Sequence, residues 1–96
     1  MLSSSARQLD EVLRALADPT RRHLYGRIAM APGLSTAQLS EEIVAMSRWG
    51  VMKHLEVLRA AGLIQTLPQG RRRRHYPEPA ALGPLRAWLS GSEENG

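Results

Sequence analysis

Residues 47–62, SRWGVMKHLEVLRAAG, decide the fold of this chain. Ser47 is a good N-cap, and Gly62 readily takes the left-handed conformation that follows the end of a helix. The stretch between them therefore predicts one helix. Its apolar residues recur at i, i+4 and i+7 and would form a buried face: Val51, Leu55 and Leu58.

The opposite face of this helix carries side chains suited to reading DNA. Cationic, aromatic and thioether groups on one exposed helical face can contact base edges and thymine methyl groups in the major groove. An ordinary amphipathic surface helix is the alternative, and Met52 could instead pack against the helix before it. The predicted DNA-reading residues are Ser47, Arg48, Trp49, Met52, Lys53 and His54.

Two helical segments lie at the start of the chain. Residues 6–17 carry an apolar stripe at helical spacing. Asp18 can cap a second helix, from Pro19 to about residue 31, because proline loses no hydrogen bond at the first helical position. Three arginines of this second helix could face solvent or contact DNA phosphates: Arg21, Arg22 and Arg27.

A short third helix leads into the DNA-reading helix. Ser35 and Gln38 have the spacing of a capping box, which predicts a helix from about residue 36 to residue 45. One or two residues of the segment 34–36 could pair with the edge of a hairpin. Two helices joined by a tight turn, the second with a polar outer face, predict a helix-turn-helix.

After Gly62 the periodicity changes from helical to alternating. Residues 63–67 and 71–76 predict two strands, joined by a loop of three to four residues around positions 68–70. One alternating set of side chains in the second strand should face inward, and Tyr76 is the expected inward residue.

The second strand of this hairpin is unusually basic. Adjacent arginines repel one another and need a counter-charge, so we predict that they lie along DNA phosphates or reach the minor groove. An edge strand that uses charge to avoid aggregation is the alternative. The predicted backbone-binding residues are Arg71, Arg72, Arg73 and Arg74.

Apolar stripes at both ends of the chain exceed what so small a domain can cover. The last helix should become regular near Pro84. Pairing of the first and last helices with a second copy would cover both stripes, although core packing of Leu85 and Trp88 is an alternative. The predicted interface residues are Leu9, Val12, Leu13, Leu16, Leu82, Leu85, Trp88 and Leu89.

The composition agrees with a small nucleic-acid-binding domain. The 96 residues include 13 Lys and Arg against 9 Asp and Glu, which gives a formal net charge of +4. A basic domain favours nucleic acid as partner before an anionic membrane, although an arginine bias can also reflect genome composition. The chain has no cysteine, no apolar run long enough for a membrane span and no signal-peptide pattern, so we expect a cytoplasmic protein.

We therefore predict a mainly α fold with a small β-hairpin, in the order α-α-α-α-β-β-α. Residues 6–89 would form the domain, between a flexible lead at 1–5 and a flexible tail at 90–96.

Four segments in this order resemble the ArsR/SmtB family of winged helix-turn-helix regulators. LADPTRRHLYGRI (16–28) and LSTAQLSEEI (34–43) resemble the second and third helices of the family. MSRWGVMKHLEVLRAAGLI (46–64) resembles its recognition helix and following strand, and GRRRRHYPEPAAL (70–82) its wing and exit. The resemblance implies a homodimer that joins through its first and last helices, binds an operator in double-stranded DNA and represses transcription.

The chain departs from the metal-sensing members of that family. Their third helix carries paired cysteines, where this sequence has Ser35, Thr36, Leu39 and Ser40. The carboxylates after the last helix, Glu93 and Glu94, have no histidine partner there. No two histidines have the spacing of a helical zinc site, so we expect no metal and no cofactor. The chain looks closer to the metal-independent subgroup, whose effectors, small molecules or proteins, are often unknown.

An enzyme is not expected, because no acid–base pair, nucleophile or phosphate loop is evident. The alternative to a DNA-binding regulator is a winged-helix module that binds another protein without binding DNA.

Overall fold

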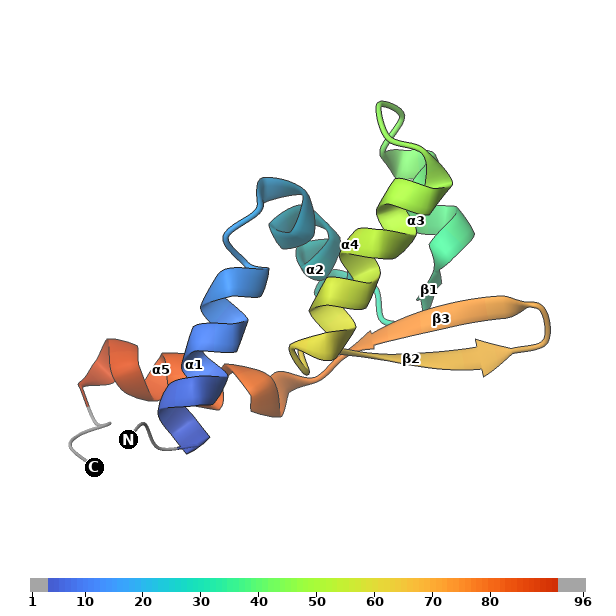
Figure 1. Cartoon of the computed structure of the whole chain (residues 1–96). Helices are drawn as coiled ribbons and strands as arrows, with labels where there is room; N and C mark the ends of the chain where they lie inside the picture. Colours follow the sequence, from blue (N-terminus) through green and yellow to red (C-terminus); the bar gives the residue numbers. More distant parts are fainter. Residues whose placement is uncertain (1–3, 92–96) are drawn as a thin grey trace.

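The computed structural model describes residues 4–91, which contain five α-helices, one short 3-10 helix and three strands. Their order is that of the predicted winged helix-turn-helix (Figure 1). The elements are α1 (Ser4–Ala15), α2 (Pro19–Met30), β1 (Leu34–Ser35), α3 (Thr36–Glu42), α4 (Arg48–Ala60), β2 (Ile64–Gln69), β3 (Arg72–Pro77), η1 (Pro79–Leu82) and α5 (Gly83–Ser90). The parts of the expected lead and tail at 1–3 and 92–96 lie outside the described residues.

Helix α1 lies two residues earlier than predicted, from Ser4 to Ala15. Two arginines of α2 contact its C-terminal end. Arg21 Nε donates a hydrogen bond to the carbonyl oxygen of Ala15 (2.6 Å), and Arg22 Nη1 donates to that of Leu16 (2.6 Å). These bonds satisfy carbonyl groups that a helix end leaves without partners. Arg21 and Arg22 therefore join α2 to α1, a role that the sequence did not reveal.

The helix N-caps predicted from the sequence are present. Asp18 accepts a hydrogen bond from the backbone N–H of Arg21 (3.0 Å) ahead of the helix that starts at Pro19. Ser35 Oγ accepts from the backbone N–H of Gln38 (3.1 Å), and the Gln38 side chain accepts from the backbone N–H of Ser35 (2.8 Å). This reciprocal pair is the capping box. The polar residues before each helix thus define where it begins.

The turn of the helix-turn-helix spans residues 43–46, because α3 ends at Glu42, three residues earlier than predicted. Ile43 and Met46 pack against the core from this turn. Gly50, in the first turn of α4, leaves room for Met46, since a Cβ added there would lie 2.8 Å from Met46 Cγ. The turn is therefore held by apolar contacts rather than by a glycine of its own.

Helix α4 buries the predicted apolar face in the centre of the molecule. Its end at Gly62 (φ +79°) is a Schellman motif, in which the N–H of Leu63 bonds the carbonyl of Leu58 (3.0 Å) and that of Gly62 bonds Arg59 (2.9 Å). The buried core consists of Val12, Ala15, Leu24, Ile28, Leu39, Val51, Leu55, Leu58, Leu63 and Ile64. One side of α4 is thereby fixed inward and the other outward.

The three strands form an antiparallel sheet in the order β1-β3-β2. Residues 34–35 pair with β3, as the sequence allowed. The expected loop of three to four residues is wrong, because Pro68 pairs with Arg73 and Gln69 with Arg72, which leaves Gly70 and Arg71 as a two-residue turn. Proline is tolerated in β2 because this is an edge strand, whose outward-facing N–H groups have no neighbouring strand to pair with. We call the hairpin β2–β3, residues 64–77, the wing.

The inward residue of β3 is His75 rather than Tyr76. His75 is buried, whereas Tyr76 is half-buried on the other face of the strand, with its ring close to Gly33. Two threonine hydroxyl groups satisfy the imidazole nitrogens, so the ring can be buried without an unpaired polar atom. Hydrophobicity alone suggested tyrosine and did not anticipate this polar pocket.

The molecule is elongated, with principal extents of 44 × 26 × 23 Å. Helices α1 and α5 pack together at one end, and the wing projects from the other (Figure 1). The helix-turn-helix of α3 and α4 lies between them. None of the described helices is long and apolar enough to cross a bilayer.

The capping box gives a direct test of the α3 boundary. Replacing Ser35 by Ala removes the acceptor for the Gln38 N–H in a buried position, so we expect the free energy of unfolding to fall by about 1 kcal/mol. Urea denaturation measures the change. The control is Ser40→Ala in the same helix, which should change stability by less than about 0.5 kcal/mol. Equal effects of the two variants would show that the cap does not define this helix.

Candidate nucleic-acid interface

The outer face of α4 presents an unusual group of exposed side chains. Trp49 is 68% exposed and Met52 46% exposed, while Arg48 and Lys53 are also at the surface. Lys53 Nζ lies 5.0 Å from the centroid of the Trp49 ring, within the range of a cation–π contact. An exposed tryptophan beside cations leaves a large amphipathic contact surface without an intramolecular cover.

Two residues of the predicted DNA-reading set already have intramolecular partners. Ser47 Oγ accepts the hydrogen bond of the Gly50 N–H (3.1 Å) as the N-cap of α4. His54 Nδ1 lies 3.3 Å from Arg21 Nη1 and 3.9 Å from an Asp18 carboxylate oxygen, at the start of α2. The structure therefore brings together Arg48, Trp49, Met52 and Lys53, whereas His54 is directed toward α2.

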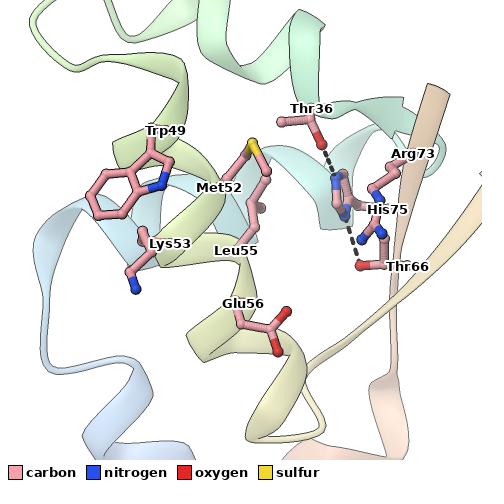
Figure 2. A pocket seen from close by; sticks show the side chains of 9 residues that line it. All are labelled: Thr36, Trp49, Met52, Lys53, Leu55, Glu56, Thr66, Arg73 and His75. Carbon is pink, nitrogen blue, oxygen red and sulfur yellow. Dashed lines mark hydrogen bonds between the residues drawn. The ribbon is translucent and has the colours of Figure 1, made fainter. Parts of the chain in front are cut away.

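A groove of about 220 Å³ separates α4 from the wing. Trp49, Met52 and Lys53 line it from α4, and Arg73 and His75 line it from β3 (Figure 2). Sequence reasoning did not anticipate this groove, because it depends on how the hairpin packs against the helix. The exposed face of α4 and the basic strand β3 thus face one shared surface.

The four arginines of the wing are not equivalent. Arg74 Nη1 donates a hydrogen bond to the carbonyl oxygen of Gly33 (2.9 Å), and its Nε donates to the side chain of Gln69. Arg74 is half-buried and joins the wing to the segment before β1. Arg71, Arg72 and Arg73 are exposed at and next to the turn. These three, and not Arg74, have their charge directed to the surface.

Two arginines elsewhere on the surface, Arg27 and Arg59, are paired with carboxylates. Arg27 Nε lies 2.9 Å from a carboxylate oxygen of Glu42, an ion pair that was neither of the two roles considered for Arg27 from the sequence. Arg59 hydrogen-bonds Glu56, and this bond lowers the pKa of Glu56, with a smaller effect from the charge of Arg73. Glu56 lines the groove, so its pairing with Arg59 reduces the negative charge next to the wing.

A second exposed surface lies at the α1–α5 end of the molecule. Trp88 is 59% and Leu89 68% exposed, and Leu13 is exposed on α1. Val12, which the sequence placed with these residues, is instead buried in the core of the single chain, because α1 turns it toward the other helices. Leu16, Leu82 and Leu85 are partly buried and pack against the same core. The exposed apolar residues of the predicted interface set are therefore Leu13, Trp88 and Leu89.

Within residues 4–91, no group of three or more His, Asp or Glu side chains is arranged to hold a metal ion. The three histidines lie in separate surroundings, with His23 exposed on α2, His54 beside Asp18 and His75 inside the wing. The carboxylates Glu93 and Glu94 lie outside the described residues.

An exposed helix of a helix-turn-helix beside a basic hairpin defines the class of helix-turn-helix DNA-binding proteins. Residues 16–66 match the family described as "Helix-turn-helix domain". The chain is 39% identical over 86 residues, 90% of its length, to the HTH-type transcriptional regulator Rv2034 of Mycobacterium tuberculosis, and the match covers 78% of that protein.

Solved structures narrow the class further. The crystal structure of the ArsR family transcriptional regulator RHA00566 superposes with a TM-score of 0.81 at 34% identity, covering 94% of this chain and 90% of that one. An ArsR-like transcriptional regulator from Rhodococcus sp. RHA1 gives a TM-score of 0.78 at 28% identity, with 92% and 81% coverage. The chain belongs to the ArsR family of transcriptional regulators. Its relatives are regulators, so the prediction that it is not an enzyme is confirmed.

The buried histidine predicts a pH dependence of stability. Burial, with a smaller effect from the charge of Arg73, lowers the pKa of His75 from its ordinary value of 6.5 to about 4. The unfolded chain therefore binds a proton between these values and the folded chain does not. We expect His75 to cost up to about 3 kcal/mol of stability as the pH falls from 6.5 to 4.

Urea denaturation of the wild type and of His75→Gln at several pH values measures this dependence. Glutamine keeps hydrogen-bonding groups in the pocket but does not titrate. The wild type should lose more stability than the variant between pH 6.5 and 4. Parallel curves for the two proteins would contradict the assigned burial of a neutral imidazole.

Proposed function

We propose that the protein is a homodimeric repressor that binds a specific operator in double-stranded DNA through α4 and holds the flanking backbone with its wing. The observation that carries this proposal is the exposed group on α4, Arg48, Trp49, Met52 and Lys53, beside the exposed arginines of the wing. A buried inner face holds α4 firmly, which base recognition requires. A regulator of this kind would act on chromosomal DNA, in line with the predicted cytoplasmic location.

Base recognition would come from the first turns of α4. Arg48 is exposed in the first turn, where a guanidinium can bond guanine O6 and N7 in the major groove. Trp49 and Met52 offer apolar surface for thymine methyl groups. Lys53 lies over the Trp49 ring, so these two side chains would meet DNA as a unit. Ser47 and His54 would act indirectly, by capping α4 and by joining it to α2.

Backbone binding would come from the tip of the wing. Arg71, Arg72 and Arg73 are exposed, and a guanidinium bonds phosphate oxygens through two N–H groups. Such contacts add affinity that depends on salt and carry little sequence information. Arg74 would support the wing from within, since it bonds the Gly33 carbonyl.

Dimerisation would use the surface at the α1–α5 end. Leu13 on α1 and Trp88 and Leu89 on α5 are exposed apolar residues. Helices α1 and α5 lie at the end of the molecule opposite the wing (Figure 1). A two-fold axis there would leave both copies of α4 accessible and set them about 34–36 Å apart, for half-sites one DNA turn apart. Leu9, partly buried on α1, would lie at the margin of this contact.

The signal that releases DNA would not be a metal bound by cysteines. The sequence has no cysteine, and the positions of α3 where metal sensors carry thiolates are occupied by serine, threonine and leucine. A small molecule or a protein is the expected type of effector, if one is used.

Substitutions in α4 and in the wing should have different effects on DNA binding. Arg48→Ala should cost about 1–3 kcal/mol on the selected sequence and relax discrimination at one base position per half-site. Arg72→Ala should weaken binding to selected and scrambled duplexes alike and flatten the plot of log K against log salt by about one unit per lost contact. Fluorescence titrations with a genomic fragment selected by the wild type, and with its scrambled version, measure both.

Arg7→Ala is the matched control, because it removes the same charge from α1 at the far end of the molecule. It should leave both affinities nearly unchanged. If Arg72→Ala lost specificity while Arg48→Ala changed only the salt dependence, the roles of helix and wing would be reversed. If the wild type bound neither duplex, a protein-interaction module would be the better description.

The dimer is tested by adding charge to its proposed surface. Trp88→Glu combined with Leu89→Glu should give a monomer with weakened DNA binding, since two buried carboxylates would oppose association. Sedimentation velocity at micromolar concentration measures the mass. Met30→Glu is the control, because Met30 is as exposed as these residues but lies at the end of α2. A monomeric wild type under the same conditions would count against the proposed interface.

A further inference from the structure

His75 connects the wing to the helix-turn-helix through its side chain. Its Nε2 lies 2.8 Å from Thr36 Oγ1, and its Nδ1 lies 2.9 Å from Thr66 Oγ1 (Figure 2). Only 2% of His75 is exposed, and Thr36 is buried as well. A neutral imidazole has one N–H, so one hydroxyl group donates to the ring and the other accepts from it. Both ring nitrogens are thereby satisfied by threonine hydroxyl groups at the inner wall of the groove.

The two hydrogen bonds of His75 connect different parts of the structure. Thr66 is directly opposite His75 on the neighbouring strand, so that bond lies within the wing. Thr36 is the first residue of α3, so the other bond joins the wing to the helix-turn-helix. His75 therefore makes one contact that crosses to α3, with Thr36, and one similar contact that stays within the wing, with Thr66.

Backbone bonds alone hold the wing only from one edge. The two-residue strand β1 pairs with β3 at Leu34 and Ser35, and the N–H of Gly33 donates to the His75 carbonyl (2.8 Å). The imidazole adds a contact from the face of β3, at right angles to that edge. Together with the Arg74 bond to the Gly33 carbonyl and the burial of Ile64 in the core, this face contact restricts rotation of the hairpin toward or away from α3.

Small rotations at His75 become large displacements at the end of the wing. The turn at Gly70 and Arg71 lies four to five positions before His75, a distance of roughly 15 Å along the strand. A rotation of about 10° would move the turn by roughly 2.5 Å, which is close to the length of a hydrogen bond. Contacts between the exposed arginines and a phosphate backbone would therefore be sensitive to the position of this one ring.

We propose that the hydrogen bond between His75 and Thr36 is a positioning contact that sets the wing relative to α3 and α4, and thereby the reach of Arg71 and Arg72 to the DNA backbone. The inference rests on the proposed function for its effect on DNA. The geometric part, that this bond orients the wing, stands on the contacts of the chain itself.

Thr36→Val removes the hydroxyl group on α3 and keeps the shape of the side chain, and Thr66→Val is the matched control within the wing. Binding to a duplex of random sequence, about 30 base pairs long, reports the backbone contacts without knowledge of the operator. We expect Thr36→Val to weaken this binding about fivefold and to lower the salt dependence by about one unit. Thr66→Val should stay within about twofold of the wild type.

Substitutions of His75 separate the effects of the two hydrogen bonds in a second way. Glutamine reaches the position of Nε2 and can keep the bond to Thr36, whereas asparagine reaches only the position of Nδ1 and can keep the bond to Thr66. His75→Gln should therefore bind the random duplex more tightly than His75→Asn. If the substitutions only destabilised the fold, both variants would melt at a lower temperature. They would still bind the duplex equally well at temperatures below their melting points.

Residual dipolar couplings of backbone amides test the orientation without DNA. Couplings of β3 relative to α4 should change in Thr36→Val and stay as in the wild type in Thr66→Val. Unchanged couplings in Thr36→Val, or equal effects of both threonine variants on affinity, would overturn the inference. Failure of the wild type to bind the duplex would instead contradict the proposed function, and the couplings would then decide the inference.

Discussion

Burial of one face of α4 is the constraint on which the rest of the structure depends. Val51, Leu55 and Leu58 lie in the centre of the core, so the helix cannot rotate without exposing them. At about 25 cal/mol per Å² of apolar surface, exposing three such side chains would cost several kcal/mol. The residues on the opposite side are thereby held toward solvent. Trp49 and Met52 are exposed because the core occupies the other side of the helix, and this is what makes them available to a partner.

The core also places the two other functional surfaces at opposite ends. Helices α1 and α5 lie at one end, and the Schellman motif at Gly62 directs the chain from α4 into the wing at the other. Arg21 contacts both the end of α1 and His54 on α4, so polar contacts join the first helix to the proposed DNA-reading helix. A regulator that reads two half-sites needs such rigidity, because the spacing between its helices must match the turn of DNA.

Local signals in the sequence were sufficient for the helices and their caps. Asp18, Ser35 and Ser47 predicted three helix starts that the structure contains, since a cap depends only on residues within one turn. The features that were missed depend on contacts between distant segments. Arg21 caps a helix six residues away, and His75 is buried by threonines from α3 and β2. Pro68 suggested a loop, but its place in an edge strand allowed pairing with Arg73. Helical periodicity was sufficient to predict the exposed residues of α4. The different role of Arg74 among the wing arginines could not be predicted, because it depends on a contact with Gly33, which is distant in the sequence.

In the proposed complex, α4 of each protomer enters the major groove of DNA. Methylation interference tests it most directly, because a methyl group on guanine N7 projects into the major groove, where Arg48 would bind. With a genomic fragment selected by the wild type, we expect methylated guanines to interfere in two clusters about 10 base pairs apart. Retained binding with guanines methylated throughout the protected site, or interference confined to adenine N3 in the minor groove, would contradict it.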